Sequence, residues 1–322
     1  MSRKSFQPAK LTLRIPGSTS NLGPGLDTLA LAVRLYTYLT IELLDSPGVE
    51  QPIVNLTGSG AAGSQESAQA NLVYKVISTL LRNDMTLLRR ARVTIESEVP
   101  LGAGLGSTSS AILGALWAAS VIQDLIPTRS WILAQAAQIG GHMEFLAASL
   151  MGGLVICAYS GEETGVVTQR LPWPEDWHAL LVVPEYRLAS PQARSVLPEN
   201  VRLSDAIHNI QRTALLVAAV ANHDEAAFKS ALDDRLHEKH RTGLVPDLLP
   251  LRQHLADQPI LGCVLSGAGS GLTVFVNQRR KEEVRESVLN WAANQENRMD
   301  VLSVDIDQEG MQELSNVPVG TE

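Results

Sequence analysis

One segment limits the folds open to this chain more than any other, because it joins a strand to a helix through a turn rich in glycine. Residues Arg92–Glu98 alternate apolar and polar side chains, with Val93 and Ile95 on one face, as a half-buried strand does. Three glycines and four hydroxyl side chains follow in Pro100–Ser110, and an apolar helix is predicted from there to about Gln123. Strands and helices must therefore be mixed along this chain.

Such a turn is suited to binding an anion. Backbone N–H groups that glycine leaves accessible, together with the positive end of the following helix, attract phosphate. Ser and Thr side chains stand where a helix N-cap is expected, and Ser107 is placed to offer its hydroxyl to Mg²⁺ or to a phosphate oxygen. The segment is neither a P-loop nor a dinucleotide fingerprint. Tight packing of a turn against a sheet also uses glycine, so a structural role stays open.

Composition narrows the class of protein. The 322 residues include 45% hydrophobic and 19% charged side chains, as in soluble globular proteins. A net charge of −8 disfavours nucleic acid as a partner. No apolar run reaches the roughly 18–20 residues of a membrane span, so a cytoplasmic protein without membrane contact is expected. Cys157 and Cys263 each lie in an aliphatic, strand-like run and are expected to be buried thiols.

The length predicts two domains, 1–171 and 172–322, divided near the proline-rich Leu171–Pro174. The segment 58–69 has the composition of a flexible loop. Predicted strands cover 11–15, 28–44, 92–98, 154–159, 179–183 and two pieces of 261–276. Predicted helices cover 71–82, the segment up to Gln123, 130–150 with an interruption at Gly140-Gly141, 204–222 and 224–238.

Three motifs in order resemble one superfamily. Pro16–Asp27 resembles the first motif of homoserine kinases, Pro100–Ser110 resembles the phosphate loop of the GHMP kinases, and Leu265–Gly269 resembles their third motif. The resemblance extends to Ser190–Pro198, to 205–219 and to 234–246, and so covers nearly the whole chain. The chain is therefore identified as a member of the GHMP kinase superfamily, most similar to the homoserine kinases.

The resemblance implies a fold and an activity. The implied fold is α+β and has two domains, an N-terminal domain like domain 2 of ribosomal protein S5 and a ferredoxin-like C-terminal domain, with the active site between them. The implied reaction transfers the γ-phosphoryl group of ATP, with Mg²⁺, to the hydroxyl of L-homoserine or a close relative. The partners are a nucleotide and a small amino acid. The oligomeric state is left open, a homodimer included.

The resemblance also assigns residues. Substrate binding falls on Asn21, Asp27, Ser190, Arg194 and Arg241. Arginine can clamp a carboxylate and aspartate can pair with an ammonium group, although singly these residues also suit loops and solvated surfaces. The nucleotide residues are Pro100, Gly102, Gly104, Leu105, Gly106, Ser107, Thr108, Ser109, Gly267 and Gly269.

One patch departs from the superfamily pattern. Members usually carry Glu and then Gly-His-Pro-Asp-Asn, whereas this chain reads Gln138-Ile-Gly-Gly-His-Met-Glu-Phe145. His142 remains, the upstream carboxylate is absent, and Glu144 is the candidate to hold the metal together with Ser107. Ser270-Gly271 also replaces the usual Pro-Ser or Pro-Thr of the third motif.

Three hypotheses follow from this patch. The first is a working kinase of homoserine, threonine or another hydroxy-acid. The second is a relative recruited to non-kinase chemistry on a small polar acid, with Asp27, His142 or Glu144 transferring protons. The third is a nucleotide-binding pseudokinase.

Overall fold

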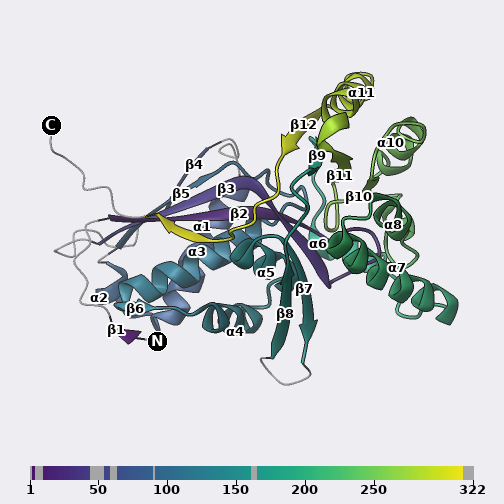
Figure 1. Ribbon diagram of the computed structural model, residues 1–322. Helices are drawn as coiled ribbons and strands as arrows, with labels where there is room; N and C mark the ends of the chain where they lie inside the picture. The colour runs from purple at the N-terminus through teal and green to yellow at the C-terminus, as the bar shows by residue number, and fades with distance from the viewer. Residues whose placement is uncertain are drawn as a thin grey trace.

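The computed structural model describes residues 2–3, 10–43, 54–58, 64–89, 91–160 and 165–314. They form a large and a small β-sheet with helices packed against both (Figure 1). This arrangement confirms the mixed α+β class.

Within the described residues, the large sheet has seven strands. Its order is β13 (Gln312–Leu314), β2 (Lys10–Ser20), β3 (Leu29–Leu43), β5 (Ala91–Ser97) and β4 (Val54–Gly58), and β7 (Leu154–Tyr159) with β8 (Val166–Leu171) continues from β3. All pairs are antiparallel except β4 with β5. A register shift between Pro16 and Gly17 divides β2, because proline cannot donate to the ladder. One half of β3 therefore pairs with β5 and the other half with β7.

Helices pack against this sheet. They are α1 (Ser64–Leu80), α2 (Met85–Leu88), α3 (Ser107–Ile122), α4 (Arg129–Ile139) and α5 (Met143–Met151), and Figure 1 shows α3 and α4 below the sheet. Every residue of α3 from Ser109 to Ile122 is buried. A helix that is buried all round must lie in the core, which fixes the glycine turn that precedes it. A two-stranded ribbon of β1 (Ser2–Arg3) and β6 (Leu125–Ile126) lies beyond α3.

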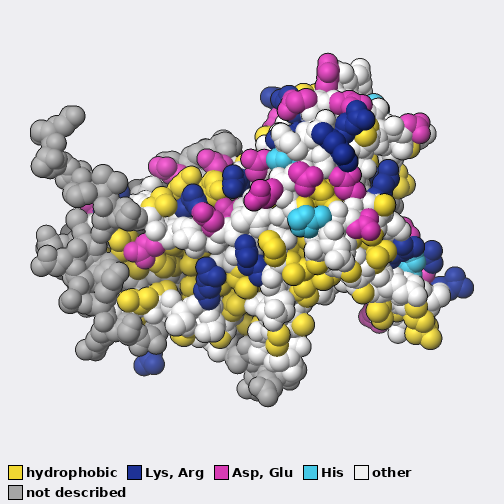
Figure 2. Space-filling view, viewed as in Figure 1, with side chains coloured by type: hydrophobic (Ala, Val, Ile, Leu, Met, Phe, Trp, Pro, Cys, Tyr) yellow, Lys and Arg dark blue, Asp and Glu magenta, His cyan; other side chains and the backbone are white. Residues whose placement is uncertain are grey.

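The small sheet has the antiparallel order β10 (Gly262–Leu265), β11 (Leu272–Asn277), β9 (Trp177–Pro184) and β12 (Met299–Val304). Helices α10 (Leu248–His254) and α11 (Lys281–Ala293), the latter preceded by the 3₁₀ helix η1 (Gln278–Arg280), accompany it. Helices α6 (Ser190–Ser195), α7 (Leu203–Asn222), α8 (Glu225–Ala231) and α9 (Glu238–Arg241) complete this half. In Figure 2, acidic and basic side chains are intermixed over its upper part.

The two sheets meet through the loop between β10 and β11. Ser266 donates its hydroxyl to the carbonyl of Gly104, at 2.8 Å, and the Gly267 N–H donates to the carbonyl of Ser20, at 3.1 Å. The Ser18 N–H of β2 donates to the carbonyl of Leu105 at 3.1 Å. The predicted phosphate loop is therefore held by hydrogen bonds to both halves of the chain.

Several boundaries differ from the prediction. Helix α1 begins at Ser64, not at Asn71, and residues 59–63 of the predicted flexible segment lie outside the described residues. The expected helix 224–238 is broken after Ala231, and the predicted strand 11–15 is longer in the structure, because Pro16–Ser20 also belongs to β2. The interruption at Gly140 is confirmed, since α4 ends at Ile139 and Gly140 has a positive φ of 84°.

The two cysteines are free and buried, which confirms their expected state, and burial raises the pKa of Cys157 to about 11 and of Cys263 to about 12. No helix in the described part of the chain has the length and apolarity needed to span a membrane. The division at residue 171 stays a prediction. The residues after 171 form the small sheet, but strand β13 near the end of the described chain pairs with β2 of the large sheet.

Candidate active site

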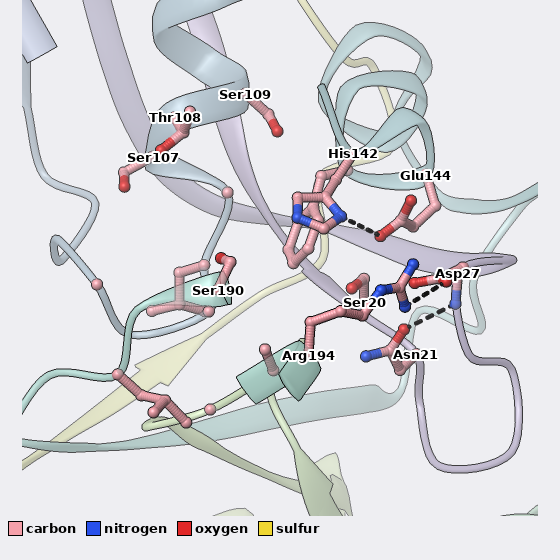
Figure 3. Close-up of a pocket in the computed structure, with 18 of the residues that line it drawn as sticks. Ser20, Asn21, Asp27, Ser107, Thr108, Ser109, His142, Glu144, Ser190 and Arg194 are labelled. Atoms are coloured by element: carbon pink, nitrogen blue, oxygen red, sulfur yellow. Dashed lines mark hydrogen bonds and ion pairs between the residues drawn. The ribbon is translucent and has the colours of Figure 1, made fainter. Parts of the chain in front are cut away.

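A cavity of about 450 Å³ lies between the turn that precedes α3, the loop after β2 and helices α5, α6 and α9. Figure 3 shows the hydroxyl side chains at the start of α3 on one side and the loop carrying Asp27 on the other. The predicted site residues that line it are Asn21, Asp27, Gly102, Gly104, Leu105, Gly106, Ser107, Thr108, Ser109, His142, Glu144, Ser190, Arg194, Arg241 and Gly269. Pro100 and Gly267 are not among the residues that line it.

The glycine turn owes its shape to positive φ angles. Gly102, Gly104 and Gly106 have φ of 72°, 69° and 74°, a region that side chains rarely adopt. A Cβ on Gly104 would meet the Ser266 carbonyl oxygen at 1.9 Å, so this glycine also permits the contact between the two halves. The glycine turn therefore has the structural role as well as the accessible backbone expected of an anion site.

The N-terminus of α3 has no side-chain cap. Its N-cap is Gly106, which has no side chain to bond the first N–H groups, so the expected Ser or Thr cap was wrong. Ser110 instead donates its hydroxyl back to the Gly106 carbonyl, at 3.2 Å. The first N–H groups of a helix need a partner, and a phosphate oxygen is a suitable one.

The loop after β2 is built around Asn21. Asn21 and Asp27 have φ of 69° and 56°, a conformation that Asn and Asp adopt more readily than other side chains. Asn21 donates from Nδ2 to the Gly267 carbonyl at 2.7 Å and accepts the Asp27 N–H at 3.0 Å. Asn21 is therefore a bridge between motifs one and three, and it orients Asp27.

Asp27 pairs with Arg194 of α6. Arg194 donates from Nη1 to Asp27 Oδ2 at 2.7 Å, and the two side chains are 55% and 38% exposed. This pair is accessible from the cavity, so a ligand with both a carboxylate and an ammonium group can reach both charges.

Arg241 is the buried cation of the site, with 3% of its surface exposed. It donates from Nε to the Ala193 carbonyl at 3.2 Å, and its Nη1 lies 3.0 Å from His237 Nδ1. The His237 Nε2 lies 2.7 Å from the Gly23 carbonyl, so one ring nitrogen accepts from the guanidinium and the other donates to the carbonyl. Burial lowers the pKa of Arg241. His237 thereby links Arg241 to the loop of Asp27.

His142 and Glu144 stand at the start of α5. Glu144 is 3% exposed, and its burial raises the pKa of the carboxyl from 4.5 to about 7, with the nearby Asp27 charge adding to the effect. The nearby Ser20 hydroxyl lowers the pKa of Glu144 somewhat, although its distance and angles do not meet those of a normal hydrogen bond. Burial lowers the pKa of His142, whose Nδ1 lies 3.9 Å from Glu144 Oε1. A carboxyl with a pKa near 7 can both release and accept a proton at neutral pH.

Phe145 fills the place of the usual polar residue. A Cβ on Gly267 would lie 2.6 Å from its ring, and one on Gly106 would lie 3.2 Å from it, so the ring is wedged between the turns of motifs two and three. Its carbonyl accepts the Ser18 hydroxyl at 3.2 Å. Phe145 therefore replaces a polar contact with packing against the glycine turn.

The donor atoms available to a metal fall into two groups. Asp27, His142 and Glu144 place one ligand atom each within 4.8 Å of one another. This set suits Mg²⁺ poorly, because it includes an imidazole and because Asp27 already pairs with Arg194. The Ser107 hydroxyl lies on the opposite side of His142 from Glu144 in Figure 3, beside the N-terminus of α3. An ion there fits only if the nucleotide's phosphates supply most of its ligands.

Some residues of the site were not predicted. Ser20, Phe145, Leu188, Pro191 and Ala268 also line the cavity. Ser20 lies within the first motif, so position alone could have suggested it. His237 and its role beside Arg241 could not have been found, because its second ring partner, the Gly23 carbonyl, comes from a segment far away in the sequence.

Comparisons with known proteins agree with this architecture. The profile described as "GHMP kinases N terminal domain" matches residues 71–161. A homoserine kinase of Solibacter usitatus is 36% identical over 86% of this chain and 88% of its own length, and one of Desulfitobacterium hafniense is 31% identical over 92% and 98%.

Solved structures share the fold. A homoserine kinase from Cytophaga hutchinsonii superposes with a TM-score of 0.81 at 21% identity, covering 97% of this chain and 100% of that one. A mevalonate diphosphate decarboxylase from Enterococcus faecalis gives 0.68 at 13% identity, covering 96% and 99%. The two-sheet α+β fold is thus that of the GHMP kinases, and the chain belongs to the GHMP kinase superfamily. Within the superfamily its sequence relatives are proteins named homoserine kinase.

Proposed function

We propose that this protein transfers the γ-phosphoryl group of ATP, with Mg²⁺, to the hydroxyl of L-homoserine or a closely related hydroxy-amino acid. One observation carries the proposal: a single cavity joins a helix N-terminus without a side-chain cap to a paired Asp27 and Arg194 with the buried Arg241 beside them. The first feature suits a triphosphate and the second suits a zwitterion.

The nucleotide's phosphates would lie on the turn Gly102–Gly106 and the first N–H groups of α3. Ser107 would contribute its hydroxyl to the ion that the phosphates hold. When bound, Mg²⁺ neutralises charge that develops on the transferred group. The proposed nucleotide set also includes the residues flanking these, Thr108, Ser109 and Gly269, whereas Pro100 and Gly267 would act through the shape of the loops.

The amino acid would enter between Asp27 and Arg194. Its ammonium group would pair with Asp27 and its carboxylate with Arg194 and Arg241, while Asn21 holds the loop and Ser190 offers a further hydroxyl. Asp27 and Arg194 each exchange the other's charge for a ligand group of the same sign, and Arg241 gains a carboxylate beside its neutral partners. Binding therefore leaves no charge unpaired, which limits its desolvation cost.

In the transfer itself, the substrate oxygen forms a bond to the γ-phosphorus, the bond to the β-phosphate oxygen breaks, and the hydroxyl proton must leave. Glu144 is the group we propose to take that proton, because its carboxyl has a pKa of about 7 and lies beside the amino-acid end of the cavity. Asp27 and His142 surround it. The alternative role of Glu144 is that of a metal ligand.

Two alternative functions stay open. A carboxyl with a pKa near 7 beside His142 is also what proton-transfer chemistry without ATP would need, which is the recruited-enzyme hypothesis. A pseudokinase would bind the nucleotide and turn nothing over.

Calorimetric titration with ATP and Mg²⁺, followed by ADP release over a panel that includes L-homoserine, L-threonine and L-serine, separates the three. The kinase proposal predicts ATP binding and ADP release that depends on one amino acid, with a phosphorylated product seen by mass spectrometry. ATP binding without turnover would favour the pseudokinase, and absence of both would favour the recruited enzyme. Asp27→Asn should abolish the ADP release that the amino acid stimulates, while ATP should still bind.

A further inference from the structure

Arg241 and Asp27 belong to different segments of the chain, and the distance between them has to suit the ligand. Arg241 is the last residue of α9 and is 3% exposed, whereas Asp27 lies in the loop after β2. In the proposed function Arg241 binds the carboxylate of the amino acid and Asp27 binds its ammonium group. An α-amino acid has both groups on the same carbon atom, so their separation is constant. Whatever fixes the separation of Arg241 and Asp27 therefore influences which ligands fit.

His237 joins the two segments. Its side chain is fully buried, and it precedes Arg241 by four residues, so that both side chains lie on one face of the same turn. Arg241 donates from Nη1 to His237 Nδ1 at 3.0 Å, and His237 Nε2 lies 2.7 Å from the Gly23 carbonyl. Because a guanidinium group can only donate, the ring proton is on Nε2, which donates to Gly23. One ring therefore binds the guanidinium group and the loop of Asp27.

Arg241 is also bonded to helix α6, which carries Arg194. Its Nε donates to the Ala193 carbonyl at 3.2 Å, and the next residue, Arg194, pairs with Asp27 at 2.7 Å (Figure 3). The contacts thus form a closed ring, from Arg241 through His237 to the loop, and from Asp27 through Arg194 back to Arg241. An entering amino acid would separate only the exposed pair of Asp27 and Arg194, and the buried bonds would stay in place.

The backbone beside His237 is held by Asp234, whose side chain is also fully buried. Asp234 Oδ2 accepts the N–H groups of His237 and Glu238, at 2.9 and 2.8 Å. Asp234 Oδ1 accepts from Asn209 Nδ2 at 2.8 Å. The His237 ring therefore starts from a fixed backbone and has both nitrogens bonded, which leaves it little freedom to turn.

Helix α7 holds the loop at the same place. Asn209 and Thr213 donate to the carbonyl of Pro24 at 3.1 and 3.0 Å. Gly23 has φ of 76°, and a Cβ there would clash with the Leu232 carbonyl oxygen, so the loop passes close to this segment. The loop cannot move away from the buried ring without breaking these contacts.

We propose that His237 is a positioning residue that sets the spacing between the ammonium site at Asp27 and the carboxylate site at Arg241, and thereby selects α-amino acids. The proposal rests on the proposed function, which supplies the roles of Asp27 and Arg241. His237 is not among the residues that line the cavity, so it acts through the two groups that it bonds. A purely structural role would affect every ligand alike, whereas a positioning role affects ligands according to the charged groups that they carry.

Two amide side chains can separate the two bonds of the ring. The Oδ1 atom of asparagine reaches about as far as Nδ1 of histidine, so His237→Asn keeps the acceptor for Arg241 and loses the bond to Gly23. The Nε2 atom of glutamine reaches about as far as Nε2 of histidine, so His237→Gln keeps the donor to Gly23 and loses the acceptor. Each variant therefore loosens one end of the connection.

Calorimetric titration with three ligands tests the proposal. L-homoserine has both charged groups, 3-amino-1-propanol lacks the carboxylate, and 4-hydroxybutanoate lacks the ammonium group. His237→Gln should raise the Kd of L-homoserine and 4-hydroxybutanoate roughly tenfold and leave that of 3-amino-1-propanol unchanged, because Arg241 loses its orientation. His237→Asn should raise the Kd of L-homoserine and 3-amino-1-propanol by a similar factor and leave that of 4-hydroxybutanoate unchanged, because the loop of Asp27 is released.

A fourth ligand tests the spacing itself. In 3-amino-4-hydroxybutanoate the two charged groups are one carbon atom further apart than in L-homoserine. The wild type should bind this isomer at least about tenfold more weakly than L-homoserine, and both variants should show a smaller preference. His240→Gln, on the same turn and not among the residues that line the cavity, is the matched control and should change no Kd.

Near-ultraviolet circular dichroism checks that the variants are folded, and since each has its own insensitive ligand, either variant decides alone. Equal losses for all ligands in both variants, or no loss in either, would overturn the proposal. So would a wild type that binds L-homoserine no better than its isomer, or binds neither. These titrations need no ATP, so the expected pattern in a protein that releases no ADP would count against the proposed phosphoryl transfer and leave the role of His237 intact.

Discussion

Replacing Glu144 by glutamine should make the protein more stable and less active at the same time. The side chain is 3% exposed, and burial raises the pKa of its carboxyl from 4.5 to about 7. At 1.36 kcal/mol per pH unit, this difference corresponds to about 3 kcal/mol of stability that the ionised carboxylate costs the folded protein. Glutamine has nearly the same shape and carries no charge at any pH.

The pH dependence has a definite sign. Below about pH 4.5 the carboxyl is protonated in both the folded and the unfolded chain, so the variant gains nothing. Between 4.5 and about 7 the unfolded chain loses the proton first, and the wild type loses stability as pH rises; above about 7 the full difference is present. Urea unfolding at pH 5 and pH 8 should give an advantage of the variant below ~1 kcal/mol at pH 5 and of about 3 kcal/mol at pH 8.

Activity should change in the opposite direction. If Glu144 accepts the hydroxyl proton, Glu144→Gln should lower turnover by roughly 10²–10⁴-fold. The wild-type rate should rise about tenfold from pH 6 to pH 8 as the carboxyl ionises. Glu296→Gln, at an exposed position, is the matched control and should change neither quantity. An unchanged stability difference between pH 5 and pH 8 would refute the burial argument, and a raised Mg²⁺ requirement with otherwise normal turnover would make Glu144 a metal ligand.

Three further changes test other parts of the site. Thr108→Glu puts a negative charge at the N-terminal end of α3, so ATP affinity measured by calorimetry should fall at least about tenfold while Thr108→Gln leaves it nearly unchanged; equal affinities would mean that phosphates bind elsewhere. Arg194→Met should raise the KM for the amino acid by roughly 10–100-fold and leave the KM for ATP unchanged, and a selective effect on ATP would reassign this residue. Phe145→Asn should lower the free energy of unfolding by about 3 kcal/mol, because the wedged ring is lost; a neutral effect in urea unfolding would show that the polar residue fits equally well.

The sequence carried most of the information about the fold and the identity of the polar groups. The glycine turn and the helix after it depend on short-range rules, since positive φ angles favour glycine and a run of apolar residues favours a buried helix. The three motifs predicted the superfamily, and Asn21, Asp27, Arg194 and Arg241 do line one cavity. Residue type and local spacing were sufficient for this.

Tertiary structure alone decided the state of those groups. The residues next to Glu144 in the sequence do not show that its side chain is buried. Its pKa depends on that burial and on Asp27, which is far away in the sequence. The same holds for His237, which joins Arg241 to the Gly23 carbonyl.

Helix α7 shows the limit most simply. Its periodicity is visible in the sequence and predicts a helix with one apolar face, but periodicity does not tell which face meets the protein. The hydrogen bonds from Asn209 and Thr213 to the Pro24 carbonyl hold the polar side of α7 against the loop of Asp27. Leu216, Ala219 and Val220 are buried on that side as well. Leu203, Ile207 and Ile210 are left exposed, because a helix has only one orientation once its other face is bonded and packed.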